Sequence, residues 1–133
     1  MIKIYGGTVT QGVRNGIVIS EGTGLNPVTT APLNAWNNEE GDPIRLAVRT
    51  DAGYRSYNEV TISLEGATEN KWRVAPNVAG APGAWSDWGG ELNVGYITDV
   101  NTLFWVQAKA TNDEVTANDE SVKIKVSAFV IKE

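Results

Sequence analysis

Apolar residues recur at every second position in several parts of this chain, and this period of two limits the fold more than any other feature. Over residues 121–130, valine, isoleucine and alanine alternate with serine, lysine and one phenylalanine. The same alternation occurs over residues 44–49, 60–65 and 102–111. Because successive side chains of a β-strand point to opposite faces, each of these segments is predicted as a strand with one buried face.

The remaining segments complete an all-β pattern. Trp72 and Val74 flank Arg73 in a further short strand, and less regular strands are expected near residues 13–20, 28–36 and 91–97. Clusters of Gly, Asn and Asp separate these runs, and none of the intervening segments has the 3.6-residue period of an amphipathic helix. These patterns predict about seven to nine short antiparallel strands. A two-sheet β-sandwich buries one face of each strand, and a closed barrel is the structural alternative.

The chain is predicted to form a single domain. Its 133 residues match the usual size of one domain, and no linker divides them. Residues 1–12 are expected to form an N-terminal arm, or an edge strand over residues 2–5, and residues 13–133 the sandwich. The prolines and glycines across residues 76–84 are expected to interrupt any regular element there.

Two missing residue types exclude most catalytic and metal-binding chemistry. The chain has no cysteine and no histidine. Disulfides, thiolate metal sites, His-ligated zinc and Ser-His-Asp triads are therefore excluded. With no motif for any other reaction, we expect a protein that is not an enzyme and that needs no cofactor or metal.

Charge and hydropathy bear on partners and compartment. The formal net charge of −5 lacks the basic footprint of a nucleic-acid-binding protein. No apolar stretch approaches the roughly 20 residues that cross a bilayer, and the N-terminal residues do not resemble a secretory signal. We therefore expect no nucleic-acid or membrane partner, and no exported precursor.

Acidic residues offer two weak candidates for chemistry. Asp87, Glu91 and Asp99 lie near an aromatic segment, and paired carboxylates can hydrolyse glycosides. The segments 113–114 and 118–120 carry oxygen ligands that calcium accepts, but they lack the EF-hand spacing. Neither group has a diagnostic motif, so scattered surface acids are the favoured interpretation.

The five tryptophans are the most informative side chains. Trp72 and Trp36 are expected in the core, whereas Trp105 falls on the opposite face from Phe104 and is expected to point outward or under a loop. Trp85 and Trp88 lie in a Gly- and Ser-containing loop. This pair is predicted to cover the open end of the sandwich. Contact with a protein partner and stacking on sugar rings stay open as alternatives.

Two tyrosines near Arg55 carry a similar ambiguity. Tyr54 and Tyr57 are candidates for a protein interface, where tyrosine is enriched. The favoured interpretation makes them strand residues that pair across a hairpin.

The second half of the chain has a distinctive order of elements: Lys71–Val74, the Gly83–Trp85 segment, the strand Leu103–Ala108 and the final alternating strand. In the first half, Asn37–Gly41 is expected to form a loop after Trp36. This order resembles that of small immunoglobulin-like β-sandwich proteins of tailed bacteriophages and prophages. The resemblance covers about residues 28–130, and the loop over residues 76–90 departs from it. The resemblance implies a structural component of the virion, located in the virion or in the bacterial cytoplasm before assembly.

The sequence therefore predicts a non-enzymatic structural or interaction protein with protein partners, a homo-oligomer among them. Trp85, Trp88, Trp105, Tyr54 and Tyr57 are its candidate interaction residues. The alternative function is a carbohydrate-binding module that uses Trp85 and Trp88 with Tyr96.

Overall fold

The computed structural model describes residues 2–20, 43–65, 71–108, 123–127 and 129–132. Within these ranges the protein is built of antiparallel β-strands, so the predicted all-β class is confirmed. The predicted strand over residues 28–36, Trp36, and the acidic segments 113–114 and 118–120 lie outside the described residues. No helix in the described ranges is long and apolar enough to cross a membrane.

The described strands form three sheets. A six-stranded sheet has the order β2-β1-β3-β9-β6-β7, a three-stranded sheet has the order β10-β5-β8, and a two-stranded sheet pairs β11 with β4. The strands are β1 (Ile2–Gly6), β2 (Ile17–Ser20), β3 (Ile44–Thr50), β4 (Tyr54–Ser56), β5 (Val60–Glu65), β6 (Trp72–Val78), β7 (Ala81–Pro82), β8 (Leu92–Gly95), β9 (Thr102–Ala108), β10 (Lys123–Ser127) and β11 (Val130–Lys132). Eleven strands exceed the predicted seven to nine because several have only two or three residues.

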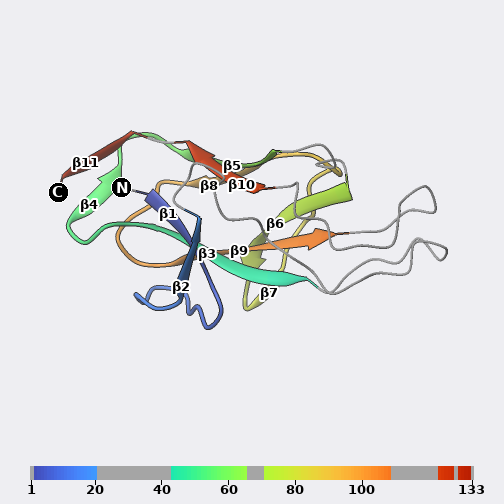
Figure 1. Ribbon diagram of the computed structural model, residues 1–133, viewed down its shortest axis with the longest axis horizontal. Coiled ribbons are helices and arrows are strands. Elements are labelled where there is room, and N and C mark those ends of the chain that lie inside the picture. The colour runs from blue at the N-terminus through green and yellow to red at the C-terminus, as the bar shows by residue number, and fades with distance from the viewer. Residues whose placement is uncertain (1, 21–42, 66–70, 109–122, 128, 133) are drawn as a thin grey trace.

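The hydrophobic core lies between the two larger sheets. Figure 1 shows β5 and β10 on one side of this core and β3 and β9 on the other. Trp72 and Phe104 are its largest fully buried side chains, and they come from neighbouring strands of the six-stranded sheet. They meet Ile62 of β5 and Val126 of β10 in one cluster. The alternation predicted these inward positions, because one face of each strand supplies them.

Three predictions about the strands are wrong in detail. Residues 2–6 form an interior strand, because β1 pairs with β2 on one side and with β3 on the other. They are therefore neither an arm nor an edge strand. The alternating segment 121–130 contributes to two strands, since β10 pairs with β5 whereas β11 pairs with β4.

The third error concerns residues 76–84, where an interruption was expected and a hairpin is found. β6 continues through Pro76 to Val78, and Asn77 then pairs with Pro82 of β7. Ala79 and Gly80 both have positive φ, of 51° and 85°. Two successive residues with positive φ form the type I′ turn that matches the twist of a tight hairpin. The prolines flank this turn and so leave the hairpin intact.

The outer face of the six-stranded sheet is covered at one end by the loop over residues 7–16. Tyr5 and Val9 pack there against Ala47 and Leu103 in a second apolar cluster. These residues lie on the face opposite the main core, so the loop gives the sheet a second, smaller core.

The fully buried Asn101 ties this loop to the sheet. Its Nδ2 donates to the carbonyl oxygen of Thr10 at 3.0 Å and to Oδ1 of Asn15 at 2.8 Å. Its Oδ1 accepts a 2.7 Å hydrogen bond from Nη1 of Arg49. Two backbone bonds join it to Gly12 and Val13. A buried amide with this many partners holds the loop in one position.

Candidate functional site

The two loop tryptophans lie over a single arginine. The guanidinium carbon of Arg73 is 4.8 Å from the ring centre of Trp85 and 4.4 Å from that of Trp88. Nε and Nη2 of Arg73 both donate to Oε1 of Gln107, at 2.9 and 2.6 Å. Cation–π contact and these hydrogen bonds together order the loop on the outer face of β6 and β9.

Backbone hydrogen bonds place this loop along β6. The amides of Gly83, Ser86 and Gly89 donate to the carbonyl oxygens of Pro76, Val74 and Trp72, at 2.7, 2.8 and 2.7 Å. Oγ of Ser86 also accepts from the amide of Val74 at 3.1 Å. The loop therefore bonds to every second residue of β6.

The pair Trp85 and Trp88 consequently differs from what the sequence predicted. Both side chains are half-buried, and Arg73 covers a face of each ring. They lie over the outer face of the sheet and not over an open end of the sandwich. A sugar-stacking platform needs free aromatic faces, and these contacts reduce what the pair offers.

Trp105 lies on the outer face, as its position opposite Phe104 predicted. It is half-buried, and its Nε1 donates to Oδ1 of Asn77 at 3.0 Å. The guanidinium carbon of Arg45 is 6.0 Å from its ring centre, at the outer limit of a cation–π contact. Its ring therefore contributes to the structure of the sheet surface as well as to its exposed area.

Tyr54 and Tyr57 are strand-associated residues, but their partner is not a neighbouring hairpin strand. Tyr54 of β4 pairs with Lys132 of β11, which lies near the C-terminus. The amide of Tyr57 donates to the carbonyl oxygen of Phe129 at 2.7 Å. The hairpin interpretation is therefore wrong about the partner.

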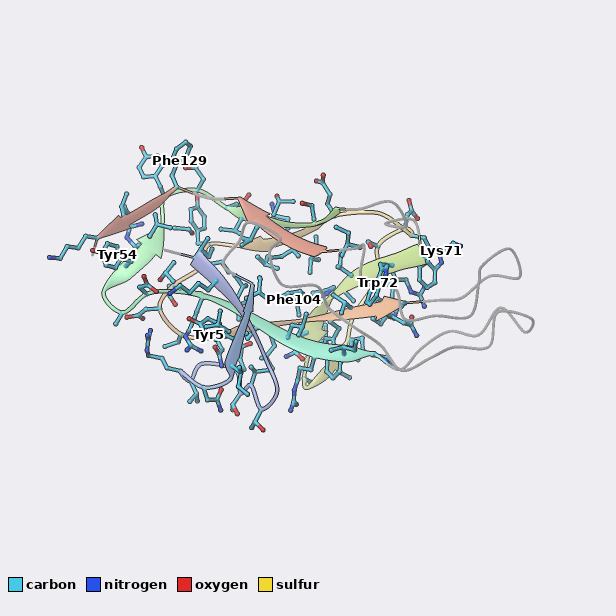
Figure 2. All side chains as sticks on the ribbon, viewed as in Figure 1. Tyr5, Tyr54, Lys71, Trp72, Phe104 and Phe129 are labelled. Atoms are coloured by element: carbon cyan, nitrogen blue, oxygen red, sulfur yellow. The ribbon has the colours of Figure 1, made fainter. Side chains whose placement is uncertain are left out.

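This pairing assembles a group of exposed aromatic side chains that we call the aromatic end, namely Tyr57, Tyr96 and Phe129. Their exposed fractions are 63%, 65% and 79%, the largest among the described aromatic residues. Figure 2 shows Phe129 projecting from the upper side of the molecule, beside the start of β11 and away from the buried Phe104.

Hydrogen bonds of Ser56 hold the segment that contains Tyr96 next to the segment that contains Tyr57. The amide of Ser56 donates to the carbonyl oxygen of Ile97 at 2.8 Å, and its Oγ accepts from the amide of Ile97 at 2.9 Å. Ser56 and Ile97 are both buried, so the residues that follow and precede them, Tyr57 and Tyr96, stand on a rigid base.

The sequence pattern alone does not bring these three aromatic residues together. It offers Tyr57 for a protein interface and Tyr96 for sugar binding, and it places Phe129 among the polar residues of an alternating strand. An aromatic residue at a position that alternation assigns to solvent was the available signal. The pairing of β11 with β4, which places Phe129 beside Tyr57, has no local signature.

The acidic residues form no metal-binding cluster in the described parts of the chain. Asp87 and Glu91 are exposed, and Oδ2 of Asp99 accepts from the amide of Gly53 at 3.0 Å. No group of three or more acidic side chains arranged to hold a metal ion occurs among the residues that the structure describes. The candidate calcium segments 113–114 and 118–120 lie outside the described residues.

The aromatic end is thus the exposed feature that the fold assembles most clearly. Comparison with known proteins adds no relative to this picture, since the chain matches no protein-family model, no curated protein and no solved structure.

Proposed function

We propose that this protein is a non-enzymatic structural subunit that associates with further copies of itself through the aromatic end. The observation that carries the proposal is the grouping of Tyr57, Tyr96 and Phe129, each more than half exposed, around one buried anchor. Aromatic residues are enriched at protein interfaces because they bury a large area at low entropic cost.

The area of the aromatic end can be compared with that of known interfaces. Aromatic side chains bury about 150–250 Å² each, so the exposed parts of three rings present roughly 300–500 Å². That is comparable to the largest apolar patch on a typical monomer, which is often functional. It is about half of the ~800 Å² per partner in a standard interface. The rings therefore supply the centre of a contact whose rim comes from their polar neighbours.

A second copy is the partner that this surface suits. A two-fold contact joins the same patch of both subunits, and aromatic side chains pack favourably on one another. The neighbouring Arg55 and Glu59 are both exposed and carry opposite charges, so a two-fold rim can pair unlike charges.

We also propose that the protein is a component of a bacteriophage or prophage virion, and that its fold is of the immunoglobulin-like class. Both are supported by the order of elements in the sequence and by an antiparallel fold with a core between two sheets. A carbohydrate-binding function through Trp85 and Trp88 is less well supported, because Arg73 covers a face of each ring.

Hydroxyl-radical footprinting over a protein concentration series tests the location of the contact. We expect Tyr57, Tyr96 and Phe129 to lose reactivity as concentration rises. Val78 is 59% exposed on the β6–β7 hairpin and serves as the internal reference that stays reactive. Unchanged reactivity of all three aromatic residues, or equal protection of Val78, would contradict the proposal.

A further inference from the structure

A second feature, independent of the aromatic end, lies where two strands of the large sheet separate. The β6–β9 ladder runs from Trp72 and Ala108 to Pro76 and Phe104. The β3–β9 ladder continues beyond it to Thr102. The first residues of β9 therefore keep a strand partner on one side only.

On the loop side of β6, the carbonyl oxygen of Pro76 accepts from the amide of Gly83 at 2.7 Å. On the β9 side, the ladder ends at Pro76 and Phe104, before Asn77 would face Leu103. The amide of Leu103 instead donates to Oε1 of the Gln11 side chain at 2.9 Å. A side chain from the 7–16 loop thus takes the place of a strand.

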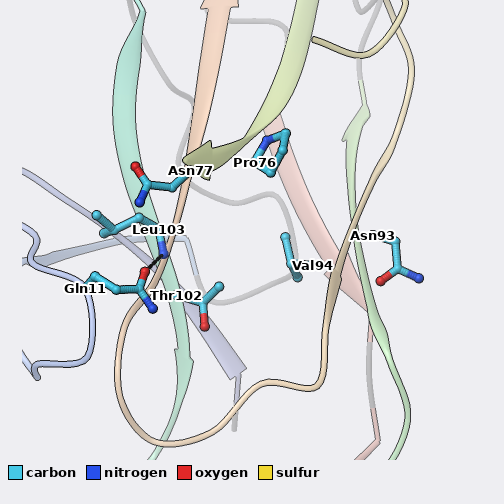
Figure 3. Close-up of a pocket in the computed structure, with 7 residues that line it drawn as sticks. All are labelled: Gln11, Pro76, Asn77, Asn93, Val94, Thr102 and Leu103. Carbon is cyan, nitrogen blue, oxygen red and sulfur yellow. Dashed lines mark hydrogen bonds between the residues drawn. The ribbon is translucent and has the colours of Figure 1, made fainter. Parts of the chain in front are cut away.

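The separation leaves a depression with a volume of about 380 Å³, which Figure 3 shows. This volume is at the lower end of the range for small-molecule sites. All seven described residues that line it are uncharged, and they comprise Gln11, Pro76, Asn77, Asn93, Val94, Thr102 and Leu103. The lining therefore combines amide groups and the hydroxyl of Thr102 with the apolar side chains of Pro76, Val94 and Leu103.

Two of the amide groups have a fixed orientation. Oε1 of Gln11 accepts from the amide of Leu103, and Oδ1 of Asn77 accepts from Nε1 of Trp105. With both oxygens occupied, the NH₂ groups are the ends left for a ligand. Among the described residues no other hydrogen bond engages these two NH₂ groups or the hydroxyl of Thr102.

We propose that this depression binds a small, neutral, oxygen-rich molecule, and that a sugar ring is the ligand class. Sugar hydroxyl oxygens accept hydrogen bonds from Gln11 and Asn77 and exchange one with Thr102. The C–H face of the ring packs on Pro76, Val94 and Leu103. A charged ligand would lose its hydration here without meeting an opposite charge.

Titration of the ¹⁵N-labelled protein with glucose, galactose and N-acetylglucosamine tests this inference. At least one sugar is expected to shift the side-chain NH₂ resonances of Gln11 and Asn77 in a saturable way. Resonances of Tyr57 and Phe129 stay unchanged, so the result is separable from association at the aromatic end. Acetate and phosphate, added at the same concentrations, are expected to have no such effect.

Matched variants make the test specific. Thr102→Val removes one hydroxyl at nearly constant shape, and Asn77→Ala removes one oriented amide. Each is expected to weaken binding about tenfold, the loss that corresponds to one hydrogen bond. Asn58→Ala removes an exposed amide outside the depression and serves as the control. The inference is overturned if none of the three sugars gives saturable shifts up to tens of millimolar, if the anions produce the same shifts, or if Asn58→Ala weakens binding equally.

Discussion

Nη1 of Arg49 donates a 2.7 Å hydrogen bond to Oδ1 of Asn101, and both side chains are buried. The same nitrogen also donates to the carbonyl oxygen of Asn15 at 2.7 Å. The guanidinium carbon lies 3.6 Å from the centre of the Tyr5 ring. This one arginine therefore joins strand β3, the 7–16 loop and the start of β9.

Asn101→Ala is expected to lower the free energy of unfolding by about 3 kcal/mol. It removes the hydrogen bond that Arg49 donates and the two that the amide donates to Thr10 and Asn15, all in a buried position. Urea denaturation followed by circular dichroism measures the change. Asn58→Ala, at an exposed loop position, is the control and stays within about 0.5 kcal/mol of the parent protein. Equal stability of the two variants would show that the buried network contributes nothing.

Gly16→Ala is expected to be more destabilising than Gly12→Ala, although both glycines have positive φ, of 101° and 76°. A Cβ at Gly16 would lie 2.6 Å from Cγ1 of Val9 and 3.0 Å from the carbonyl oxygen of Gly6, whereas a Cβ at Gly12 would meet nothing within 4 Å. Gly12→Ala costs the backbone strain alone, about 1 kcal/mol. Overpacking adds about 1–3 kcal/mol at Gly16. Thermal unfolding compares the two variants, and identical midpoints would contradict the close packing of the loop.

Arg73→Ala is expected to release the tryptophan loop. The change removes two cation–π contacts of about 0.5–1 kcal/mol each, together with the hydrogen bonds to Gln107. Trp85 and Trp88 become more exposed to solvent, so the maximum of tryptophan fluorescence emission moves to longer wavelength. The far-ultraviolet circular dichroism of the strands is retained.

Two further variants sharpen that measurement. Arg73→Lys keeps the charge but loses the planar group that stacks on the rings, so it is expected to resemble Arg73→Ala. Arg45→Ala alters only the more distant contact with Trp105 and is expected to leave the emission near that of the parent protein. An unshifted emission maximum in Arg73→Ala would mean that the backbone bonds to β6 hold the loop without the arginine.

The strands that the sequence predicted best are those with one buried face. β3, β5 and β9 lie where alternation placed them, because burial of one face imposes a period of two. The buried Trp72 and the outward Trp105 follow from the same rule. Alternation does not specify which strands pair, so it missed the interior position of β1 and the separate partners of β10 and β11.

The candidate site was predicted less well, for the same physical reason. The contact between Arg73 and Trp88 depends on a loop that turns back along β6, and the grouping of Tyr57 with Phe129 depends on the β4–β11 pairing. Both arise from partners distant in sequence. The positive φ of Ala79 likewise has no residue-type signal, since only Gly80 suggested a turn.

The central claim is that the protein associates through the aromatic end, and the mass of the protein in solution tests this claim most directly. Light scattering over a concentration series is expected to show a discrete oligomer of the parent protein that dissociates on dilution. Phe129→Ser, which removes the most exposed aromatic ring, is expected to be monomeric throughout, whereas Val78→Ser assembles normally. A parent protein that stays monomeric at every concentration, or a Phe129→Ser variant that assembles as the parent does, would contradict the account.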